Sequence, residues 1–412
     1  MVKLIFVNRY FYPDHSATSQ MLSDLAFALA AGEDMRVSVV TSRQRYDAPG
    51  ERLPARESID FVTVRRVWTS SFGRHNLAGR AIDYATFYVA SAWAIWRLAR
   101  RGDVIVAKTD PPLLSLVVAP VAWLRGAKLV NWLQDIFPEV AQALGYGKGP
   151  AARTGYRILQ RLRNWSLRQA GVNVALGDRM AEKLRQCGIA EDRIAIMPNW
   201  ASGSAVFPVA RLANPLRQEW GLDGAFVIGY SGNLGRAHET QTLLDAIAQL
   251  EAAPAGHLAI SWLFIGGGAL YQELARAVTQ AKLKSVQFRP YQPRERLAQS
   301  LSAADVHVVS LRPELEGLIV PSKFYGVAAS GRPTIFIGDK DGEIGRLVAK
   351  HQCGIQIDQD DSDGLARACL KLASDPNVCQ NMGANARNIF MEEFDKPIAV
   401  ARWNALLSRI AK

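Results

Sequence analysis

The residues best suited to chemistry lie in one stretch of the C-terminal third. Pro321, Ser322 and Lys323 end a loop and open a short helical pattern, and a Gly-Arg-Pro turn at 331–333 then leads into an apolar strand. Free N–H groups at a helix start, a Ser322 hydroxyl able to cap them and the Lys323 ammonium all favour a bound anion. The same residues also suit an ordinary capped helix after a surface loop, so this stretch alone leaves both interpretations open.

An acidic loop at 312–317 precedes this stretch. Its carboxylate Glu316 is placed to bind the hydroxyl groups of a sugar or a ribose. A position for a diphosphate next to a position for hydroxyls is what a nucleotide-sugar requires. The loop therefore predicts a nucleotide-sugar site rather than a site for a simple anion.

Two glycine-rich turns offer further places for a phosphate. Gly232 and Asn233 follow an apolar strand pattern, and Gly266 comes directly after the next strand. Either Arg236 or His238 can add positive charge to the first turn. Glycines let the backbone approach a phosphate closely, although a ligand-free turn between strand and helix also uses them. Residues 8–17, which follow the first strand, contain no glycine, and this counts against a nicotinamide-binding enzyme.

Two aspartates follow strands of the N-terminal half. Asp135 is a carboxylate among apolar neighbours, where a raised pKa suits acid–base chemistry or the binding of sugar hydroxyls. Asp110 ends the preceding strand and can contact an acceptor or a sugar. A helix N-cap at Asp135 and a purely turn-forming Asp110 before the proline pair are the competing interpretations.

The elements that must position these residues form an α/β pattern, because short apolar runs alternate with longer helical ones. We expect two doubly wound parallel sheets. We assign no helix or strand to the polar segment 42–60. The expected strands are Leu4–Val7, Val37–Thr41, Phe61–Val67, Val104–Ala107, Lys128–Trp132, Val172–Ala175 and Ile194–Met197 in the first half, and 226–230, Ser261–Ile265, Ser285–Phe288, Val306–Val309, Thr334–Ile337 and Ile355–Ile357 in the second.

The chain of 412 residues is long enough for two such domains. Prolines and glycines between 198 and 221 mark the boundary. We expect an N-terminal domain of residues 1–200 completed by the last helix, 395–412, and a C-terminal domain of residues 201–394. Two doubly wound domains facing each other would leave a cleft at the carboxyl ends of their strands.

Charge is concentrated in the N-terminal half. Residues 1–200 carry 27 Lys and Arg against 17 Asp and Glu, which accounts for nearly all of the net charge of +11. Such a bias predicts an anionic partner, either a lipid surface or nucleic acid, although an Arg-rich composition without any such role is also common. The segment 84–99 is rich in Trp and Tyr and ends at Arg100 and Arg101, so it suits either an interfacial helix or a core helix.

Neither this segment nor 113–124 is long and uninterrupted enough to cross a bilayer.

The apolar start of the chain is too short for a secretory signal and is typical of a buried first strand. The four cysteines lack the spacing of a metal site, and they fit a reducing cytoplasm. We therefore expect a cytoplasmic protein, peripherally associated with the inner face of the membrane.

Taken together, these motifs resemble the GT-B-fold retaining glycosyltransferases of glycosyltransferase family 4, in the WbuB/WcaI-like branch that builds O-antigen, capsular and colanic-acid polysaccharides. The resemblance covers nearly the whole chain. It rests on the segments 10–17, 134–139, 197–200, 230–236, 320–323 and 330–333.

The resemblance implies the GT-B fold, a C-terminal helix that crosses back to the first domain, and a donor that is a nucleotide-diphosphate sugar carrying UDP or GDP. It implies an undecaprenyl-diphosphate-linked oligosaccharide as acceptor, and neither metal nor cofactor. On this basis Lys323, Ser322 and Arg236 would hold the diphosphate, while Gly232, Asn233 and Gly266 let the donor approach the backbone. Glu316 would bind hydroxyls, Asp135 and Asp110 would orient the reacting sugars, and His15 and Ser16 would lie at the acceptor.

The chain also departs from the family pattern. Many members carry two glutamates spaced E-x7-E, but the second position is Gly326 here and Glu316 lies two residues before the first. The usual basic pair after the first glycine-rich turn falls on Asn233 and His238, and a usual Gly-Gly pair falls on Ser16 and Ala17.

These departures keep two alternatives open. One is a GT-B-like nucleotide-sugar epimerase, which would need paired carboxylates for proton transfer. The other is a catalytically degenerate subunit that binds nucleotide-sugar as a scaffold. Nucleic-acid binding is the weakest option, because the basic residues form no recognised module.

Overall fold

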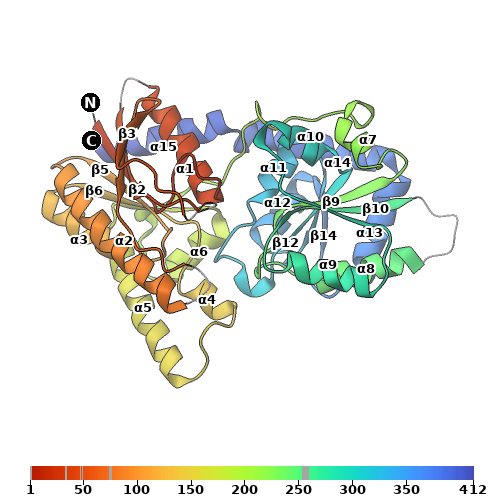
Figure 1. Ribbon diagram of the computed structural model, residues 1–412, viewed down its shortest axis with the longest axis horizontal. Coiled ribbons are helices and arrows are strands. Elements are labelled where there is room, and N and C mark those ends of the chain that lie inside the picture. The colour runs from red at the N-terminus through yellow and green to blue at the C-terminus, as the bar shows by residue number, and fades with distance from the viewer. Residues whose placement is uncertain (1, 33–34, 47, 49, 74–76, 253–258) are drawn as a thin grey trace. The chain divides into compact units, whose positions relative to one another are not determined.

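The computed structural model describes residues 2–32, 35–46, 48, 50–73, 77–252 and 259–412 (Figure 1). The chain forms two compact units, an N-terminal unit of Met1–Pro198 with Ala399–Lys412 and a C-terminal unit of Asn199–Ile398. The sequence placed these boundaries at 200 and 395. Both units are α/β, with helices packed on a parallel sheet, as the alternating pattern predicted.

The sheet of the N-terminal unit has eight strands in the order β3-β4-β2-β1-β5-β6-β7-β8. All its neighbours pair in parallel except β3, which runs antiparallel to β4. The strands are β1 (Val2–Val7), β2 (Met35–Ser42), β3 (Arg56–Ile59), β4 (Val62–Val67), β5 (Val104–Lys108), β6 (Lys128–Trp132), β7 (Val172–Ala175) and β8 (Ile194–Ile196). The seven predicted strands are all present, and β3 is an addition within the segment left unassigned.

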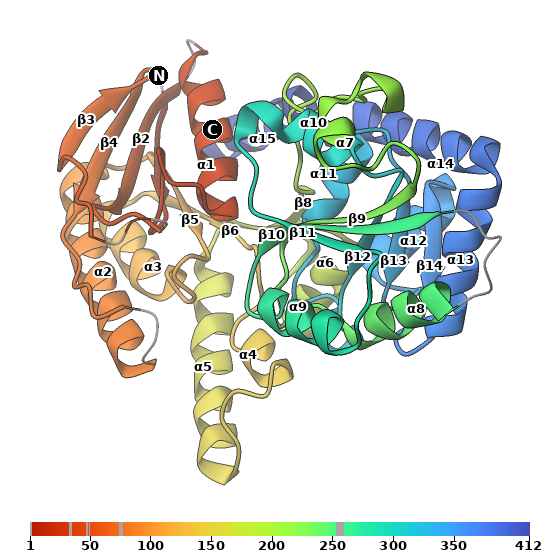
Figure 2. The same cartoon turned by 45° about the vertical axis from the view of Figure 1, so that its right-hand side comes forward.

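Helices cover both faces of this sheet (Figures 1 and 2). Both views show α2, α3 and α5 over one face, where α3 contacts both α2 and α5. The helices are α1 (Ala17–Ala30), α2 (Leu77–Leu98), α3 (Ser115–Arg125), α4 (Glu139–Ala143), α5 (Pro150–Gln169), α6 (Asp178–Gln186) and a 3-10 turn at Glu191–Arg193. None of the helices in the part of the chain described here is long and apolar enough to span a membrane.

The last helix, α15 (Lys396–Ala411), leaves the C-terminal unit and packs on the N-terminal one, as the resemblance implied. Its Trp403 is fully buried, with its ring centroid 4.7 Å from that of Trp132 at the end of β6. At the far end of the helix, Lys128 Nζ donates to the carbonyl oxygen of Ile410 at 2.7 Å. A cation at the C-terminus of a helix also complements the helix dipole.

The sheet of the C-terminal unit has six parallel strands in the order β11-β10-β9-β12-β13-β14. The strands are β9 (Phe226–Asn233), β10 (Ile260–Gly267), β11 (Val286–Arg289), β12 (Val306–Ser310), β13 (Thr334–Ile337) and β14 (Gly354–Ile357), which are the six that the sequence predicted. The helices are α7 (Pro215–Glu219), α8 (Gln241–Ala252), α9 (Tyr271–Gln280), α10 (Leu297–Ser302), α11 (Lys323–Ala329), α12 (Glu343–His351), α13 (Ser362–Ser374) and α14 (Pro376–Ile389), with 3-10 turns at Arg211–Ala213, Arg294–Arg296 and Pro313–Leu315 and a π-helical turn at Phe390–Phe394.

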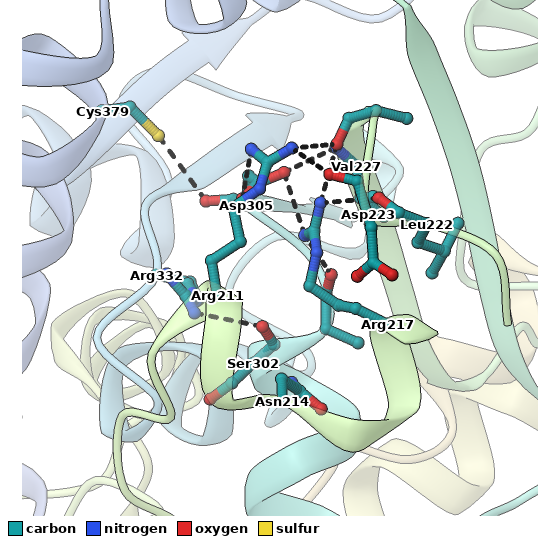
Figure 3. A network of polar contacts seen from close by, with 12 residues as sticks. Arg211, Asn214, Arg217, Leu222, Asp223, Val227, Ser302, Asp305, Arg332 and Cys379 are labelled. Carbon is teal, nitrogen blue, oxygen red and sulfur yellow. Dashed lines mark hydrogen bonds and ion pairs between the residues drawn. The ribbon is translucent and has the colours of Figure 1, made fainter. Parts of the chain in front are cut away.

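A buried polar network ties the amino ends of β9 and β12 to α7 (Figure 3). The guanidinium of Arg217 is buried and donates to the carbonyl oxygens of Ala303, Leu222 and Ala225 as well as to Asp305. The same Asp305 carboxylate accepts from the backbone N–H of Val227 in β9 at 2.7 Å. Arg217 thereby supplies donors to three carbonyl groups, of which Leu222 also accepts from the backbone N–H of Ala225 and Ala225 also accepts from Arg211.

Candidate active site

The carboxyl ends of β9 and β10 form a bare stretch of backbone. Gly266 lies opposite Gly232 in the register of these strands, with φ angles of 134° and 117°. A Cβ atom on Gly266 would lie 2.3 Å from the carbonyl oxygen of Gly232, so no side chain fits there. Positive φ and the close approach of the two strands both require glycine at Gly266, which is buried, while Gly232 is half-buried beside Lys323.

Lys323, the first residue of α11, lies over this backbone. A Cβ on Gly232 would lie 3.1 Å from Lys323 Cε. The Lys323 ammonium is 2.9 Å from His238 Nε2 and 5.2 Å from the ring centroid of Tyr230. Within the described residues it has no carboxylate partner, and burial lowers the pKa of Lys323 to about 7. A buried cation without a counter-ion is a place where an anion is strongly favoured.

His238 holds this lysine in position. Its Nδ1 lies 2.7 Å from the carbonyl oxygen of Ser310 at the end of β12, which requires that Nδ1–H donates and that Nε2 accepts from Lys323. Burial and then the charge of Lys323 lower the pKa of His238 to about 3, so the imidazole is neutral. The sequence offered His238 as the alternative to Arg236 for a positive charge at this turn. In the structure its imidazole is neutral and accepts from Lys323 instead.

The predicted cap at Ser322 is wrong. Ser322 has helical dihedral angles, φ −64° and ψ −15°, and its side chain makes no capping hydrogen bond. A capping hydroxyl needs an extended backbone to reach the N–H groups two or three residues ahead. The exposed hydroxyl of Ser322 is therefore free to meet a ligand beside Lys323.

The remaining predicted donor residues are more dispersed. Asn233 is exposed at the end of β9 and packs against the backbone of Gly268, while Arg236 is exposed in the turn before α8. The half-buried Glu316 accepts a hydrogen bond from the backbone N–H of Glu343 at 2.8 Å, at the start of α12. One oxygen of this carboxylate therefore stabilises a helix N-terminus, where negative charge is favoured.

A second group of predicted residues gathers at the carboxyl ends of β5 and β6 in the N-terminal unit. Asp135 has one buried oxygen, Oδ1, without a hydrogen-bond partner in the described part of the chain. Burial raises the pKa of Asp135 to about 6, a hydrogen bond with Thr109 opposes this, and the charge of Asp110 adds to it. A cavity of about 20 Å³ beside Asp135 has room for about one water molecule. Asp135 is not a helix N-cap, since α4 begins at Glu139.

Asp110 and the start of α1 lie together next to this carboxylate. Thr18 in the first turn of α1 donates from its hydroxyl to Asp110 Oδ2 at 3.3 Å. Beneath them is Lys108, whose buried ammonium donates to the Thr18 carbonyl at 2.8 Å and lies 3.8 Å from the ring centroid of Trp132. Burial lowers the pKa of Lys108 far below its ordinary value. We predicted no role for this lysine from the sequence.

The two predicted acceptor residues precede α1. Ser16 is the N-cap of α1, and its hydroxyl accepts from the backbone N–H of Ser19 at 3.3 Å. His15 is exposed, and its carbonyl accepts from the side chain of Gln20. The hydroxyl of Ser16 therefore already has a structural role at the start of α1.

The predicted residues therefore form two clusters, one in each unit. Gly232, Gly266 and Lys323 lie together with His238 at the carboxyl ends of β9 and β10 in the C-terminal unit. Asp110 and Asp135 make a carboxylate pair in the N-terminal unit. Among the residues with described positions, no group of three or more His, Cys, Asp or Glu side chains could hold a metal ion.

Comparison with known proteins matches both units to transferase domains. The family described as "Glycosyl transferase 4-like domain" matches residues 17–200, and "Glycosyl transferases group 1" matches residues 225–375. The probable glycosyltransferase WbjE of Pseudomonas aeruginosa is 27% identical over 74% of each chain. The putative colanic acid biosynthesis glycosyl transferase WcaI of Escherichia coli K12 is 24% identical over 65% of each.

Solved structures share the whole fold. The sucrose-phosphate synthase of Thermosynechococcus elongatus has a TM-score of 0.77 at 18% identity, covering 100% of this chain and 99% of its own. Anabaena Alr3699/HepE, solved in complex with UDP-glucose, has a TM-score of 0.72 at 17% identity, covering 99% of this chain and 100% of its own. At these identities the likeness establishes the architecture of the two units.

Proposed function

This chain belongs to the GT-B-fold glycosyltransferases of family 4, and from that premise we propose that it transfers a sugar, with retention, from a UDP- or GDP-linked donor to an undecaprenyl-diphosphate-linked oligosaccharide. The named relative WcaI and the structural neighbour in complex with UDP-glucose support a nucleotide-sugar donor and a role in surface polysaccharide biosynthesis.

The observation that carries the proposal is the half-buried Lys323 ammonium, which has no carboxylate partner among the described residues and lies over the glycine backbone of β9. A diphosphate placed there would supply the missing negative charge and restore a charged pair. The hydroxyl of Ser322, next to Lys323 in the chain, and the guanidinium of Arg236, four residues after Gly232, would add donors. Gly232 and Gly266 would let the phosphate oxygens reach backbone, and Glu316 keeps its predicted role at the donor hydroxyls.

The acceptor half of the reaction belongs to the N-terminal unit. Asp135 and Asp110 would orient the reacting sugars by accepting hydrogen bonds from hydroxyl groups, with His15 at the acceptor. Charge develops on the departing diphosphate as the glycosidic bond breaks, and Lys323 would stabilise it there. Positioning and charge stabilisation would supply most of the rate, and no residue needs to form a covalent intermediate.

A thermal-shift panel with UDP, GDP, ADP and dTDP tests the donor site on the wild type, on Lys323→Ala and on the control Lys350→Ala, which removes an exposed lysine of α12. A nucleotide that binds only the folded protein adds about 2.7 kcal/mol of stability at about 100 times its dissociation constant. We expect one nucleotide to stabilise the wild type and the control but not Lys323→Ala. If no nucleotide stabilises the wild type, the proposal fails.

We also propose that the C-terminal part of α2 contacts anionic lipid, as the sequence suggested for residues 80–101. Trp93 is 60% exposed, and the exposed Arg97 lies over its ring, with its guanidinium carbon 5.7 Å from the ring centroid. Basic residues at such a surface contribute roughly 1 kcal/mol each. Replacing Arg97, Arg100 and Arg101 together with glutamate should abolish flotation of the protein with anionic vesicles. Unchanged flotation would contradict this role of α2.

A further inference from the structure

One helix of the N-terminal unit has an unpartnered face that the proposed donor and acceptor sites do not use. Helix α5 buries Arg163, Ser166 and Leu167, and its opposite side is exposed. Both views show the first half of α5 extending beyond the sheet of its unit (Figures 1 and 2). This exposed side is defined by two rows of residues, an arginine row of Arg153, Arg157 and Arg161 and an apolar row of Ile158, Leu162 and Trp165.

The apolar row has the spacing of one helix face. Ile158, Leu162 and Trp165 are four and three residues apart, so their side chains lie one above another. They are 51%, 45% and 41% exposed, respectively. Single exposed apolar residues are ordinary, but a contiguous row of three large ones indicates a surface that becomes covered.

The charge around this row selects the kind of partner. No Asp or Glu occurs between Glu139 and Asp178. Within that interval Arg163 is buried against Glu139, at 2.6 Å, and the other basic residues are exposed. They are Lys148, Arg153, Arg157, Arg161 and Arg168. An acid-free, basic surface is complementary to a partner with dense negative charge.

We propose that the exposed face of α5 binds the anionic surface of a bilayer, with the arginine row at the headgroup phosphates and the apolar row at the boundary of the acyl chains. Arginine and apolar rows that lie side by side along one helix are the arrangement of interfacial helices, and Trp165 suits the headgroup layer. This inference rests on the proposed function in one respect, because a lipid-linked acceptor requires an enzyme at the membrane.

The neighbouring helices continue the same kind of surface. Helix α3 contacts both α5 and α2, and it ends in Trp123 and Leu124, which are 78% and 58% exposed. Arg125 follows them and lies over the ring of Trp96 in α2, its guanidinium carbon 5.2 Å from the centroid. Helix α5 therefore adds a second lipid-binding element to the one proposed on α2, and the helix between them, α3, exposes Trp123 and Leu124.

Flotation of the full chain with vesicles tests the inference, using phosphatidylcholine alone and phosphatidylcholine mixed with phosphatidylglycerol. Two variants remove one row each. The arginine variant replaces Arg153, Arg157 and Arg161 with glutamine, and the serine variant replaces Ile158, Leu162 and Trp165 with serine. The matched control is Arg276, Lys350 and Arg367→Gln, which removes three exposed charges from the C-terminal unit. At roughly 1 kcal/mol per basic residue, the arginine variant should bind anionic vesicles about a hundred-fold more weakly.

We expect the wild type and the control to float with the anionic vesicles only, and both α5 variants to lose most of this binding. Variants of α5 that float like the wild type would overturn the inference, as would a wild type that ignores anionic vesicles. A dimer of the wild type that the serine variant abolishes would also overturn it, because a second copy would then cover the apolar row.

The nucleotide thermal shift separates this inference from the proposed function. Both α5 variants should retain the wild-type melting temperature and the full shift with the donor nucleotide, since their residues lie on an exposed helix face. If flotation depends on α5 but no nucleotide binds, the lipid surface stands and the donor site fails. If nucleotide binds but flotation does not depend on α5, the donor site stands and the α5 inference fails.

Discussion

The charge state of Lys323 makes nucleotide affinity depend on pH. Burial lowers the pKa of Lys323 to about 7, so in the free protein the ammonium loses its proton as the pH rises through neutrality. A bound diphosphate favours the protonated form, and affinity should therefore be full below about pH 7 and fall by up to about tenfold per pH unit above it. Calorimetric titration with the donor nucleotide between pH 6 and 9 measures this slope.

Lys323→Arg provides the control, because a guanidinium stays protonated throughout this range. Its nucleotide affinity should show no fall above pH 7, even if its absolute value differs. Since the neutral His238 does not titrate in this range, a fall that persists in Lys323→Arg would assign the pH dependence to another group.

The ionisation of Asp135 should determine how the activity falls at acidic pH. Its pKa is raised to about 6, chiefly by burial, so the carboxylate that accepts sugar hydroxyls is present above pH 6 and is lost below it. We expect kcat/KM of the wild type to fall about tenfold per pH unit below pH 6. Asp135→Asn should be slower at neutral pH by about 10² or more and lack this fall. An Asn variant with the wild-type profile would remove Asp135 from the reaction.

At the residue scale, the residues near the candidate donor site could be predicted from the sequence better than their hydrogen-bond partners. Lys323 and the two glycines could be predicted, because each is recognisable from its type beside a strand or helix end. Two features could not be predicted, namely that Ser322 makes no capping hydrogen bond and that Glu316 accepts one from Glu343. The first depends on the dihedral angles of Ser322, and the second on helix α12, which begins 27 residues later in the chain.

At the element scale, the network around Asp305 should be the main polar contribution to the C-terminal unit. Arg217 is buried and donates four hydrogen bonds within this network (Figure 3). Arg217→Met leaves the Asp305 charge and three carbonyl groups without this donor. Removing one partner of a buried ion pair typically costs about 3–5 kcal/mol, and we expect that loss in the free energy of unfolding.

Arg211→Met is the matched comparison, since the Arg211 side chain is 41% exposed and lies 3.6 Å from the same carboxylate. An exposed ion pair contributes about 1 kcal/mol or less. Denaturant unfolding of both variants should separate them clearly. Equal losses would show that burial of Arg217 is not what gives this network its strength.

Strands with an apolar run could be predicted from the sequence, the edge strands β8, β11 and β14 among them, whereas the edge strand β3 could not. Strands such as β5 and β12 are continuous apolar runs, which is the pattern of a central parallel strand. Strand β3 has the sequence Arg-Glu-Ser-Ile and alternates between exposed and half-buried residues at the sheet edge. Its pairing with β4 is set by backbone hydrogen bonds, so its composition resembles that of a loop.

At the scale of the whole molecule, the chain completes its first unit with its last residues. Helix α15 begins in the C-terminal unit, and from Ala399 onward it belongs to the N-terminal one. The N-terminal unit can therefore pack Trp132 against its partner in α15 only once the chain has been made as far as Trp403. This crossing could be expected from the family resemblance, whereas the pairing of Trp132 with Trp403 could not, because the two residues are 271 positions apart in sequence.

Trp403→Ala should consequently destabilise the N-terminal unit selectively. Truncating a fully buried tryptophan costs about 3–5 kcal/mol, because apolar contacts are lost and a cavity remains. Trp123→Ala, at a side chain that is 78% exposed, should change stability by about 0.5 kcal/mol or less. A saturating donor nucleotide identifies the transitions in calorimetry, since it raises only the melting of the unit that binds it. We expect Trp403→Ala to lower the transition that the nucleotide leaves unchanged. A loss confined to the nucleotide-stabilised transition would mean that α15 supports the C-terminal unit instead.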